Sequence, residues 1–249
     1  MSKFTCHTAL ITGASSGIGA AFARHLAKSG VTLVLVARRA ERLQSLKAEL
    51  EQSGARVETL TADLASEEGI QAVAQKISSL SGLDLLINNA GFGITGAFSS
   101  EPLEALADML RVHDEAPMRL THAALQGMLA RKQGAIINVS SISGFLSMGG
   151  GVMYGATKAF VTTFSKALHK GLRGTGVKIQ VLCPGFTHTG FHEPSDIMKM
   201  DTKKIPDFMW MDAREVTAVS LKALDRDQSV VVPGMLYKVA VFLGRLGLV

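Results

Sequence analysis

The chain has 249 residues, of which 47% are hydrophobic and 19% are charged, and its formal net charge is +5. This length fits one large α/β domain with a substantial core, and the composition excludes an intrinsically disordered chain. The 26 lysines and arginines are scattered, with few aromatic residues among them. We therefore expect an anionic small molecule, such as a phosphorylated cofactor, as the partner and no nucleic acid.

The cysteines, Cys6 and Cys183, are too few for a disulfide framework and lack the spacing of a metal site, so we expect no metal. Their scarcity fits a reducing compartment. The chain leads directly into an apolar strand without the core of a signal peptide, and no apolar run reaches the roughly 20 residues of a bilayer span. We therefore predict a cytoplasmic protein.

Short apolar, β-branched runs alternate along the chain with segments of helical periodicity. This alternation predicts an α/β fold, a Rossmann-like, doubly wound parallel sheet with helices on both faces. Neither a repeat nor a linker divides residues 1–249, so we expect a single domain. About seven strands are predicted, near residues 8–12, 32–37, 56–60, 83–88, 135–140, 178–182 and 229–232.

The first predicted strand is followed by T-G-A-S-S-G-I-G at 12–19 and then by a helix expected to run to about Gly30. Glycines in such a turn permit a tight bend and close approach of the backbone to a pyrophosphate, and the N–H groups of the helix N-terminus face the phosphates. In this strand-turn-helix context, G-x-x-x-G-x-G predicts a dinucleotide site. The residues assigned to it here are Gly13, Ser15, Ser16, Gly17, Ile18 and Gly19.

Two arginines, Arg38 and Arg39, follow the second strand, where an NAD site needs an acidic residue to bind the ribose hydroxyls. A guanidinium can instead grip a phosphate through two parallel hydrogen bonds. We therefore predict NADP (NADPH) as the cofactor, with Ser15 sharing its 2′-phosphate. A solvated pair of surface arginines is the alternative interpretation.

The segments A-D-L at 62–64 and N-N-A-G at 88–91 follow the third and fourth strands. Ligands of open α/β sheets bind at these carboxyl ends of the strands. The carboxylate of Asp63 can accept from the adenine amino group, and small residues would admit the ribose, although each residue also fits an ordinary turn. We assign to the cofactor site Asp63, Leu64, Asn89, Ala90 and Gly91.

The stretch 141–158 carries the predicted chemistry: Ser141 closes a strand, a glycine-rich bend follows, and Tyr154-x-x-x-Lys158 opens a helix. Residues four apart share one face of a helix, so we expect the Lys158 ammonium to lower the phenol pKa of Tyr154 from about 10 and make it a usable proton donor and acceptor. Ser141 can hydrogen-bond the same substrate oxygen. Taken alone, Y-x-x-x-K is more often a surface pair; its position after a nucleotide-binding turn favours the site.

These motifs, in this order, resemble the short-chain dehydrogenase/reductase family over almost the whole chain. The resemblance is carried by T-G-A-S-S-G-I-G, N-N-A-G, Ser141, Tyr154-x-x-x-Lys158 and C-P-G-F-T-H-T at 183–189. It implies a Rossmann-like fold with strand order 3-2-1-4-5-6-7, a nicotinamide cofactor and hydride exchange with a carbonyl or an alcohol. It also implies assembly into a homodimer or homotetramer.

The resemblance further implies roles for single residues. Tyr154 would be the catalytic acid/base, and Ser141 would polarise the substrate oxygen. Lys158 would hold the nicotinamide ribose and lower the tyrosine pKa, so Tyr154 and Lys158 also belong to the cofactor site. Residues after the sixth strand would contact the nicotinamide end, namely Pro184, Gly185, Thr187 and Thr189.

One position departs from the family pattern. Where the family usually has an asparagine, as in V-N-V, this chain reads M-L-R-V-H-D-E-A-P, so His113 replaces it. The resemblance implies that this residue holds a water chain leading from the lysine, and Pro117 lacks the N–H that would bond the His113 carbonyl. We hypothesise a proton relay with His113 as an altered, titrating member of the catalytic set. A histidine that simply fills the space is an equally good interpretation.

The poorly periodic region 189–212 is predicted to form the lid and substrate pocket. Its methionines and aromatic residues favour an apolar substrate, although core packing explains them equally well. The apolar tail, 235–249, has Lys238 and Arg245 on one helical face. It would dock on its own subunit, contact a second subunit or lie on a membrane surface, and the first two are favoured.

The sequence therefore predicts an NADP(H)-dependent oxidoreductase that transfers hydride between nicotinamide and a carbonyl or secondary alcohol of an apolar small molecule. The alternative is a non-catalytic NADP-binding sensor or interaction protein on the same fold. An intact Ser141, Tyr154 and Lys158 argue against that alternative, and His113 keeps it open.

Overall fold

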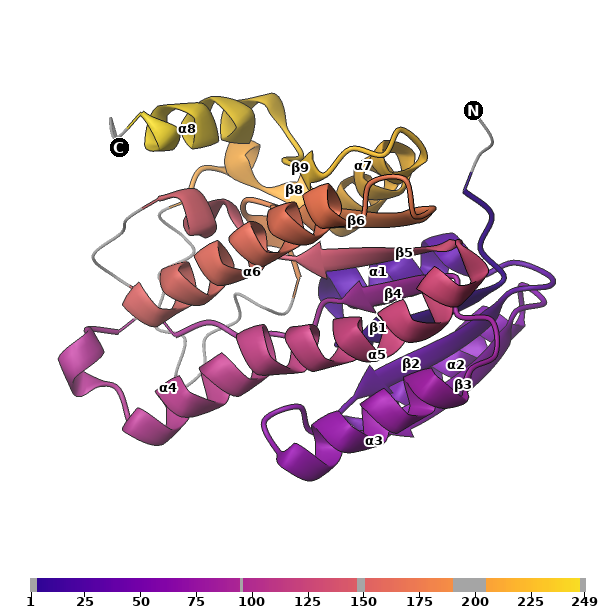
Figure 1. The fold of residues 1–249 in the computed structure, drawn as a ribbon. Helices are drawn as coiled ribbons and strands as arrows, with labels where there is room; N and C mark the ends of the chain where they lie inside the picture. The colour runs from indigo at the N-terminus through magenta and orange to yellow at the C-terminus, as the bar shows by residue number, and fades with distance from the viewer. Residues whose placement is uncertain (1–3, 95, 147–150, 190–204, 247–249) are drawn as a thin grey trace.

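A computed structural model describes residues 4–94, 96–146, 151–189 and 205–246. Most of the predicted lid (190–204), part of the glycine-rich bend (147–150) and the end of the tail (247–249) lie outside these residues. The described residues contain the sheet, the helices on its two faces and a C-terminal helix above the last strands (Figure 1).

Seven parallel strands form one sheet in the order β3-β2-β1-β4-β5-β6-β9, which confirms the predicted Rossmann-like topology with β9 as the seventh strand of the sheet. Each predicted range overlaps its observed strand. The strands are β1 (Thr8–Thr12), β2 (Thr32–Ala37), β3 (Arg56–Thr61), β4 (Leu85–Asn88), β5 (Gly134–Val139), β6 (Val177–Leu182) and β9 (Val230–Val231).

The central strands are apolar on both faces because helices cover both sides of the sheet. Successive side chains of a strand point to opposite faces. In β2, Leu33 and Leu35 therefore pack into one core layer, while Val34 and Val36 pack into the other. This is why the sequence shows continuous apolar runs in these strands, without alternation.

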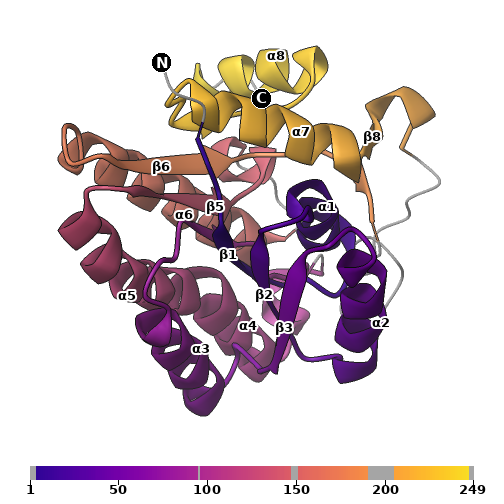
Figure 2. The same cartoon turned by 90° about the vertical axis from the view of Figure 1, so that its right-hand side faces the viewer.

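Figure 2 shows the helices divided between the two faces. One face is covered by α1 (Gly17–Leu26), α2 (Ala40–Glu51) and α7 (Ala213–Asp225). The other is covered by α3 (Glu67–Ser79), α5 (Ala116–Arg131) and α6 (Val152–Gly171), with α4 (Leu103–Leu110) leading into α5. Helix α1 ends at Leu26, short of the predicted Gly30, because the chain turns there and the Val31 N–H bonds the Lys28 carbonyl oxygen.

The remaining elements are short, apart from the C-terminal helix α8. A wide π-helical turn (Arg111–Glu115) joins α4 to α5, and 3-10 turns lie at Phe98–Ser100, Ile142–Phe145 and Asp207–Met209. Strands β7 (Thr187–His188) and β8 (Met211–Asp212) pair in parallel, so they hold together the two ends of the predicted lid. Helix α8 runs from Met235 to Arg245.

Candidate active site

Helix α6 carries Tyr154 and Lys158 on the same face, near the carboxyl end of β5. The Lys158 Nζ lies 5.6 Å from the centroid of the Tyr154 ring and donates a hydrogen bond to the Val139 carbonyl oxygen at 3.2 Å. The Lys158 side chain is buried, with 5% of the residue exposed, and Tyr154 is half-buried. The two residues therefore face the protein and do not form a solvated surface pair.

Ser141 follows β5 directly and lies beside the tyrosine. Its Oγ accepts a hydrogen bond from the Ser143 N–H at 3.1 Å, and a side-chain hydrogen bond links it to Tyr154. The turn after Ser141 packs closely on α6, because a Cβ on Gly144 would lie 2.6 Å from the Lys158 carbonyl oxygen. The strand end and the helix start thus bring the serine, tyrosine and lysine side chains together.

The ionisation of Tyr154 differs from the sequence expectation. Burial raises the pKa of the phenol to about 12, and the hydrogen bond with Ser141 opposes this only in part. The expected lowering by Lys158 is wrong for this structure, since the cost of desolvating a phenolate outweighs the other influences. Tyr154 is therefore protonated at neutral pH and suited to donate a proton.

The lysine has the opposite shift for the same physical reason. Burial lowers the pKa of Lys158 to about 8, while the charges of Asp114 and Cys183 act to raise it. A lysine with this pKa is mostly an ammonium at neutral pH and loses its charge within reach of mildly alkaline conditions.

His113 is a buried, hydrogen-bonded member of this cluster. Its Nε2 accepts from the Phe92 N–H at 3.1 Å, so its Nδ1 carries the proton and donates to the Thr157 Oγ1 at 2.9 Å. Burial, together with the charge of Lys158, lowers the pKa of His113 well below 6.5. The hypothesis of a titrating His113 is therefore wrong, because the ring stays neutral at physiological pH.

The π-helical turn at Arg111–Glu115 contains this histidine. The Ala116 N–H bonds the Arg111 carbonyl five residues earlier, where an α-helix would bond four residues back. In an α-helix the ring of Pro117 would collide with the His113 carbonyl, so the wider turn relieves that clash. The sequence identified Pro117 as important here but did not predict the π-helical turn.

The glycine-rich turn after β1 is held closely against the end of β4. A Cβ on Gly13, whose φ is 65°, would lie 2.8 Å from the Ala90 Cα, and one on Gly19 would lie 2.5 Å from the Gly13 carbonyl oxygen. Close packing of the turn on its own protein thus requires both glycines. Ser16 is the N-cap of α1, and its side chain makes no capping hydrogen bond to the first helical turn. No acidic residue lies in that turn either, as an anion site requires.

Asn89 has a structural role that the sequence did not indicate. Its side-chain Nδ2 donates to the Thr12 and Gly13 carbonyl oxygens at 3.0 and 3.3 Å, so it holds the glycine turn. The Thr12 Oγ1 accepts from the N–H groups of Asn89 and Ala90. The side chain of Asn89 therefore holds the glycine turn in place, and a contact of this residue with a cofactor stays a prediction. Sequence reasoning missed Thr12, whose place at the end of β1 was the available signal.

Arg39 lies over this turn. Its guanidinium donates to the Ser15 Oγ at 3.0 Å and to the Ser16 Oγ at 2.8 Å. A cationic fork and two hydroxyls therefore converge beside the helix N-terminus, an arrangement that fits a phosphate group. Arg38 is exposed at the same end of β2.

The other residues assigned to the adenosine side are arranged as follows. Asp63 is exposed and its Oδ1 accepts from the Ala65 N–H at 3.0 Å, whereas the Leu64 side chain is part of the core. Gly91 is exposed and lies beside the catalytic cluster, because a Cβ there would be 2.9 Å from the His113 Nε2 and 3.6 Å from the Lys158 Nζ. Gly91 therefore connects the N-N-A-G segment to the catalytic cluster.

The loop after β6 lies next to the glycine turn, as a single dinucleotide site requires. A Cβ on Gly17 would lie 3.0 Å from the Thr189 Cβ. The Pro184 carbonyl accepts from the Ile142 N–H at 3.1 Å, and the Thr187 Oγ1 donates to the Gly185 carbonyl at 3.0 Å. These contacts join the predicted nicotinamide end of the site to the turn that follows Ser141.

Helix α8 docks on its own subunit, over the loop after β6. A Cβ on Gly185 would lie 2.2 Å from the Tyr237 ring, and the Tyr237 hydroxyl accepts from the Phe186 N–H and donates to the Met209 carbonyl. The hydroxyl thereby joins the two ends of the predicted lid. Sequence reasoning missed this role, since Tyr237 resembles its apolar neighbours in the tail.

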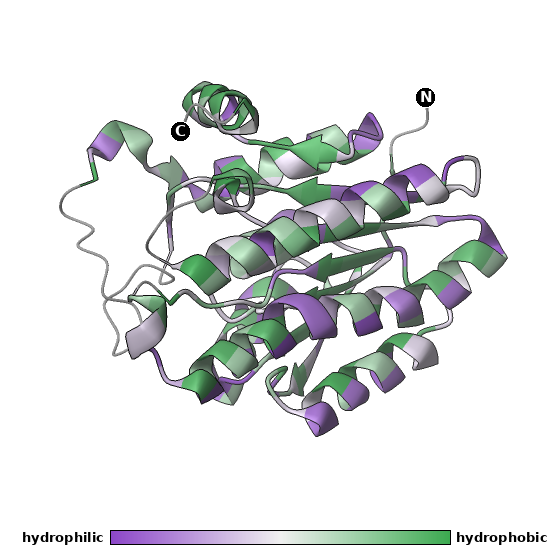
Figure 3. Ribbon diagram, turned by 60° about the vertical axis from the view of Figure 1, so that its left-hand side comes forward, coloured by the Kyte–Doolittle hydropathy of each residue, from purple (hydrophilic) through white to green (hydrophobic). Residues whose placement is uncertain are grey.

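An aromatic cluster lies at the same place. The Trp210 ring stacks on His188 with centroids 5.0 Å apart and contacts Phe186 at 5.6 Å. The outer face of α8 exposes apolar side chains, and Figure 3 shows the helix at the top of the molecule. Those side chains are Met235, Leu236, Val239 and Phe242.

Comparison with known proteins agrees with this geometry. The family model for short chain dehydrogenases matches residues 7–199. A Myxococcus xanthus protein described as an uncharacterized oxidoreductase is 35% identical over 75% of this chain and 74% of its own length. The chain belongs to the short-chain dehydrogenase family.

Solved structures of other short-chain dehydrogenases superpose on nearly the whole chain. An enzyme from Sphingobium yanoikuyae in complex with NADPH has a TM-score of 0.86 and 35% identity, covering 97% of this chain and 94% of that one. A bulky-bulky ketone specific alcohol dehydrogenase from Comamonas testosteroni has a TM-score of 0.82 and 32% identity, covering 97% and 92%. A nicotinamide cofactor is therefore bound by a solved relative of this short-chain dehydrogenase.

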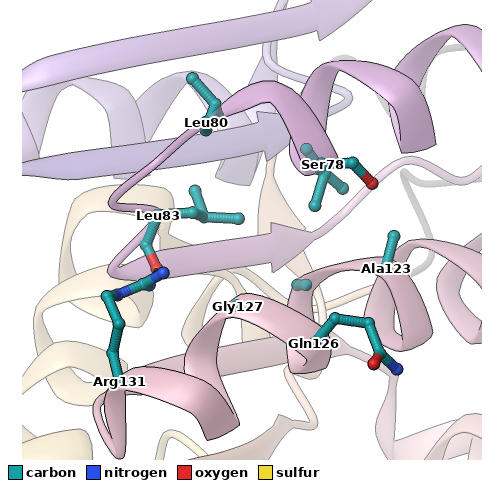
Figure 4. A pocket seen from close by; sticks show the side chains of 9 residues that line it. Ser78, Leu80, Leu83, Ala123, Gln126, Gly127 and Arg131 are labelled. Atoms are coloured by element: carbon teal, nitrogen blue, oxygen red, sulfur yellow. Dashed lines mark hydrogen bonds between the residues drawn. The ribbon is translucent and has the colours of Figure 1, made fainter.

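Two further observations concern the rest of this short-chain dehydrogenase. A cavity of about 110 Å³ lies between the end of α3, the loop into β4 and α5 (Figure 4), at the amino end of β4, whereas Tyr154 lies near the carboxyl end of β5. Within the described ranges, no three His, Cys, Asp or Glu side chains are placed to hold a metal, and no helix there is long and apolar enough to cross a membrane.

Proposed function

We propose that this short-chain dehydrogenase uses NADPH to reduce a carbonyl group of an apolar small molecule. The observation that carries the proposal is the convergence of the hydroxyls of Ser141 and Tyr154 beside the buried Lys158. A bound nicotinamide would supply the hydride. In this proposal the protein is a single domain that acts in the cytoplasm as a homo-oligomer, and residues 189–212 form its lid.

The protonation states favour the direction of reduction. Tyr154 has a pKa of about 12, so its hydroxyl keeps a proton that it can give to the developing alkoxide. Ser141 is placed to hydrogen-bond the same oxygen. The Lys158 ammonium contributes positive charge that stabilises the phenolate left behind. The residues thus stabilise and protonate an oxyanion without needing an ionised tyrosine at the start.

The preference for NADPH rests on Arg39. Its guanidinium already contacts Ser15 and Ser16, and the end of β2 provides no acidic residue in its place. A 2′-phosphate could replace the serine hydroxyls as the acceptor of the guanidinium hydrogen bonds. The NADPH in the Sphingobium yanoikuyae structure is consistent with this choice.

The apolar substrate is supported by the ends of the lid. Phe186, Trp210 and Phe208 lie there, and 78% of Phe208 is exposed. A ketone with large apolar substituents would fit such surroundings, and the Comamonas testosteroni enzyme is described as specific for bulky ketones.

The experiment is a panel of aldehydes and ketones assayed for NADPH oxidation and repeated with NADH. We expect turnover of bulky apolar ketones that is faster with NADPH. Binding of NADPH without turnover of any carbonyl or alcohol would favour the alternative, a cofactor-binding sensor. Equal activity with NADH would overturn the role given to Arg39.

A further inference from the structure

Asp114 occupies an unusual position beside the candidate active site. It lies in the π-helical turn next to His113, and its Oδ1 is buried without a hydrogen-bond partner. Burying a carboxylate oxygen without a partner is costly, so a carboxyl group in this position favours its protonated form. Single π-helical turns inside α-helices are frequent at functional sites.

The groups around Asp114 couple it to the catalytic lysine. The charge of Lys158, on α6, lowers the Asp114 pKa, which burial raises to about 7, and Asp114 in turn raises the Lys158 pKa. The neighbouring His113 is neutral. The side chain of Cys183, after β6, also raises the Lys158 pKa. The phenol of Tyr154 stays protonated.

The remaining charges on the same turn are engaged elsewhere. Arg111 pairs with Asp108 at 2.9 Å. Glu115 pairs with Arg119 at 3.1 Å, and Arg119 also binds Glu67. These pairs leave Asp114 as the carboxyl group of the turn that interacts with Lys158.

We propose that Asp114 is the residue that exchanges protons between solvent and Lys158 during turnover. The inference rests on the proposed function. Each reduction takes one proton from the Tyr154 hydroxyl and leaves a phenolate. The Lys158 ammonium returns that proton and becomes a neutral amine. The Asp114 carboxyl group then reprotonates the amine through an intervening water, because no hydrogen bond joins the two side chains directly, and becomes a carboxylate. A proton from solvent restores the carboxyl group. One proton enters from solvent for each proton delivered to substrate.

Asp114 fits this role because its side chain is half-buried, with one oxygen inside the protein and part of the residue accessible to solvent. Burial raises the pKa of Asp114 and lowers that of Lys158, so the two values approach each other and the free-energy cost of moving a proton between the two groups falls. His113 cannot substitute for it, because both ring nitrogens are hydrogen-bonded and the ring does not titrate near neutrality.

The first test needs no catalysis. In protein labelled with ¹³C at the aspartate carboxyl carbon, the Asp114 signal is assigned by its loss in Asp114→Asn and followed against pH by NMR. We expect a midpoint near 7 and a higher midpoint in Lys158→Met, because the ammonium favours the carboxylate. A wild-type midpoint near the ordinary value of about 4 would overturn the inference, even if Lys158→Met does not fold.

The second test measures turnover with NADPH and an active ketone. We expect Asp114→Asn to lower kcat about tenfold, less than the 10²–10⁴-fold expected for loss of a direct proton donor. On the alkaline side of the pH profile, the kcat of Asp114→Asn should begin to fall at a lower pH than that of the wild type. The reason is that the Lys158 pKa falls when the Asp114 carboxylate is removed. Imidazole buffer should restore kcat in Asp114→Ala in a saturable way.

The matched control is Glu115→Gln, the neighbouring carboxyl group, which bonds Arg119. It should keep the wild-type kcat, pH profile and indifference to imidazole. If the wild type reduces ketones while Asp114→Asn keeps its kcat and pH profile, the inference fails and the proposed function stands. If the wild type lacks all reductase activity, the proposed function fails, and the NMR titration still decides whether Asp114 and Lys158 exchange charge.

Discussion

His113 donates its Nδ1 proton to the hydroxyl of Thr157 at 2.9 Å, and this hydroxyl donates to the Tyr154 carbonyl oxygen at 3.0 Å. The histidine thus supports the turn of α6 that carries the tyrosine. Its Nε2 is bonded to the Phe92 N–H. A neutral, doubly hydrogen-bonded imidazole therefore occupies the position where the family usually has asparagine.

The neutral state of His113 predicts how stability depends on pH. The pKa of His113 is lowered on folding, so the unfolded chain takes up a proton below about 6.5 that the folded protein does not. Both states are neutral above that pH, so His113 weakens the fold only as the pH falls below it. We expect His113→Asn to flatten the fall in unfolding free energy between about pH 6.5 and 5, measured by denaturant titration. Unchanged steepness would contradict the buried neutral ring.

The same variant should leave the ionisations seen in the pH dependence of kcat unchanged, since His113 does not titrate in that range.

His113→Phe is a sharper change, because it leaves the Phe92 N–H and the Thr157 hydroxyl without their partners. We expect it to lower the unfolding free energy by about 1–3 kcal/mol. Equal stability of the phenylalanine and wild-type proteins would show that these hydrogen bonds contribute nothing.

Arg39→Ala should weaken NADPH binding more than NADH binding, because the guanidinium is the group placed for the extra phosphate. A charge-assisted hydrogen bond contributes about 1.5–3 kcal/mol, so we expect a rise in Kd for NADPH of roughly 10- to 100-fold. Fluorescence titration with each cofactor measures it. Arg24→Ala is the control, since Arg24 pairs with Glu49 away from the turn. Equal losses for NADPH and NADH would contradict the assignment.

Tyr237→Phe should loosen the connection between the two ends of the lid. The ring would still pack on Gly185, but the Phe186 N–H and the Met209 carbonyl would lose their shared hydroxyl. We expect a loss of about 1–3 kcal/mol in unfolding free energy and a raised KM for the ketone, with a smaller change in kcat. An unaltered KM in a folded variant would show that α8 does not position the lid.

Gly185→Ala tests the same packing from the other side. Its Cβ would lie 2.2 Å from the Tyr237 ring, so α8 must shift or detach from the loop after β6. We expect a lower midpoint of thermal unfolding and faster proteolysis of the tail. Gly171→Ala is a matched control, because nothing lies within 4 Å of a Cβ there. Equal effects of the two substitutions would contradict the docked position of α8.

The sheet was predictable because its central strands are buried on both faces and so appear as uninterrupted apolar runs. The relation between Tyr154 and Lys158 was predictable because helical spacing determines it locally. The pKa of Tyr154 was not, since desolvation depends on all the segments that cover the ring. Local sequence could not predict that Asn89 reaches the carbonyls after β1 or that Tyr237 binds a loop 51 residues earlier.

The measurement that tests the account most directly is turnover by Tyr154→Phe, with NADPH binding followed separately. The substitution keeps the ring and removes the hydroxyl that hydrogen-bonds with Ser141. The account predicts a loss in kcat of at least about 10²-fold, with NADPH still bound. Turnover at the wild-type rate by a variant that binds NADPH would contradict Tyr154 as the proton donor.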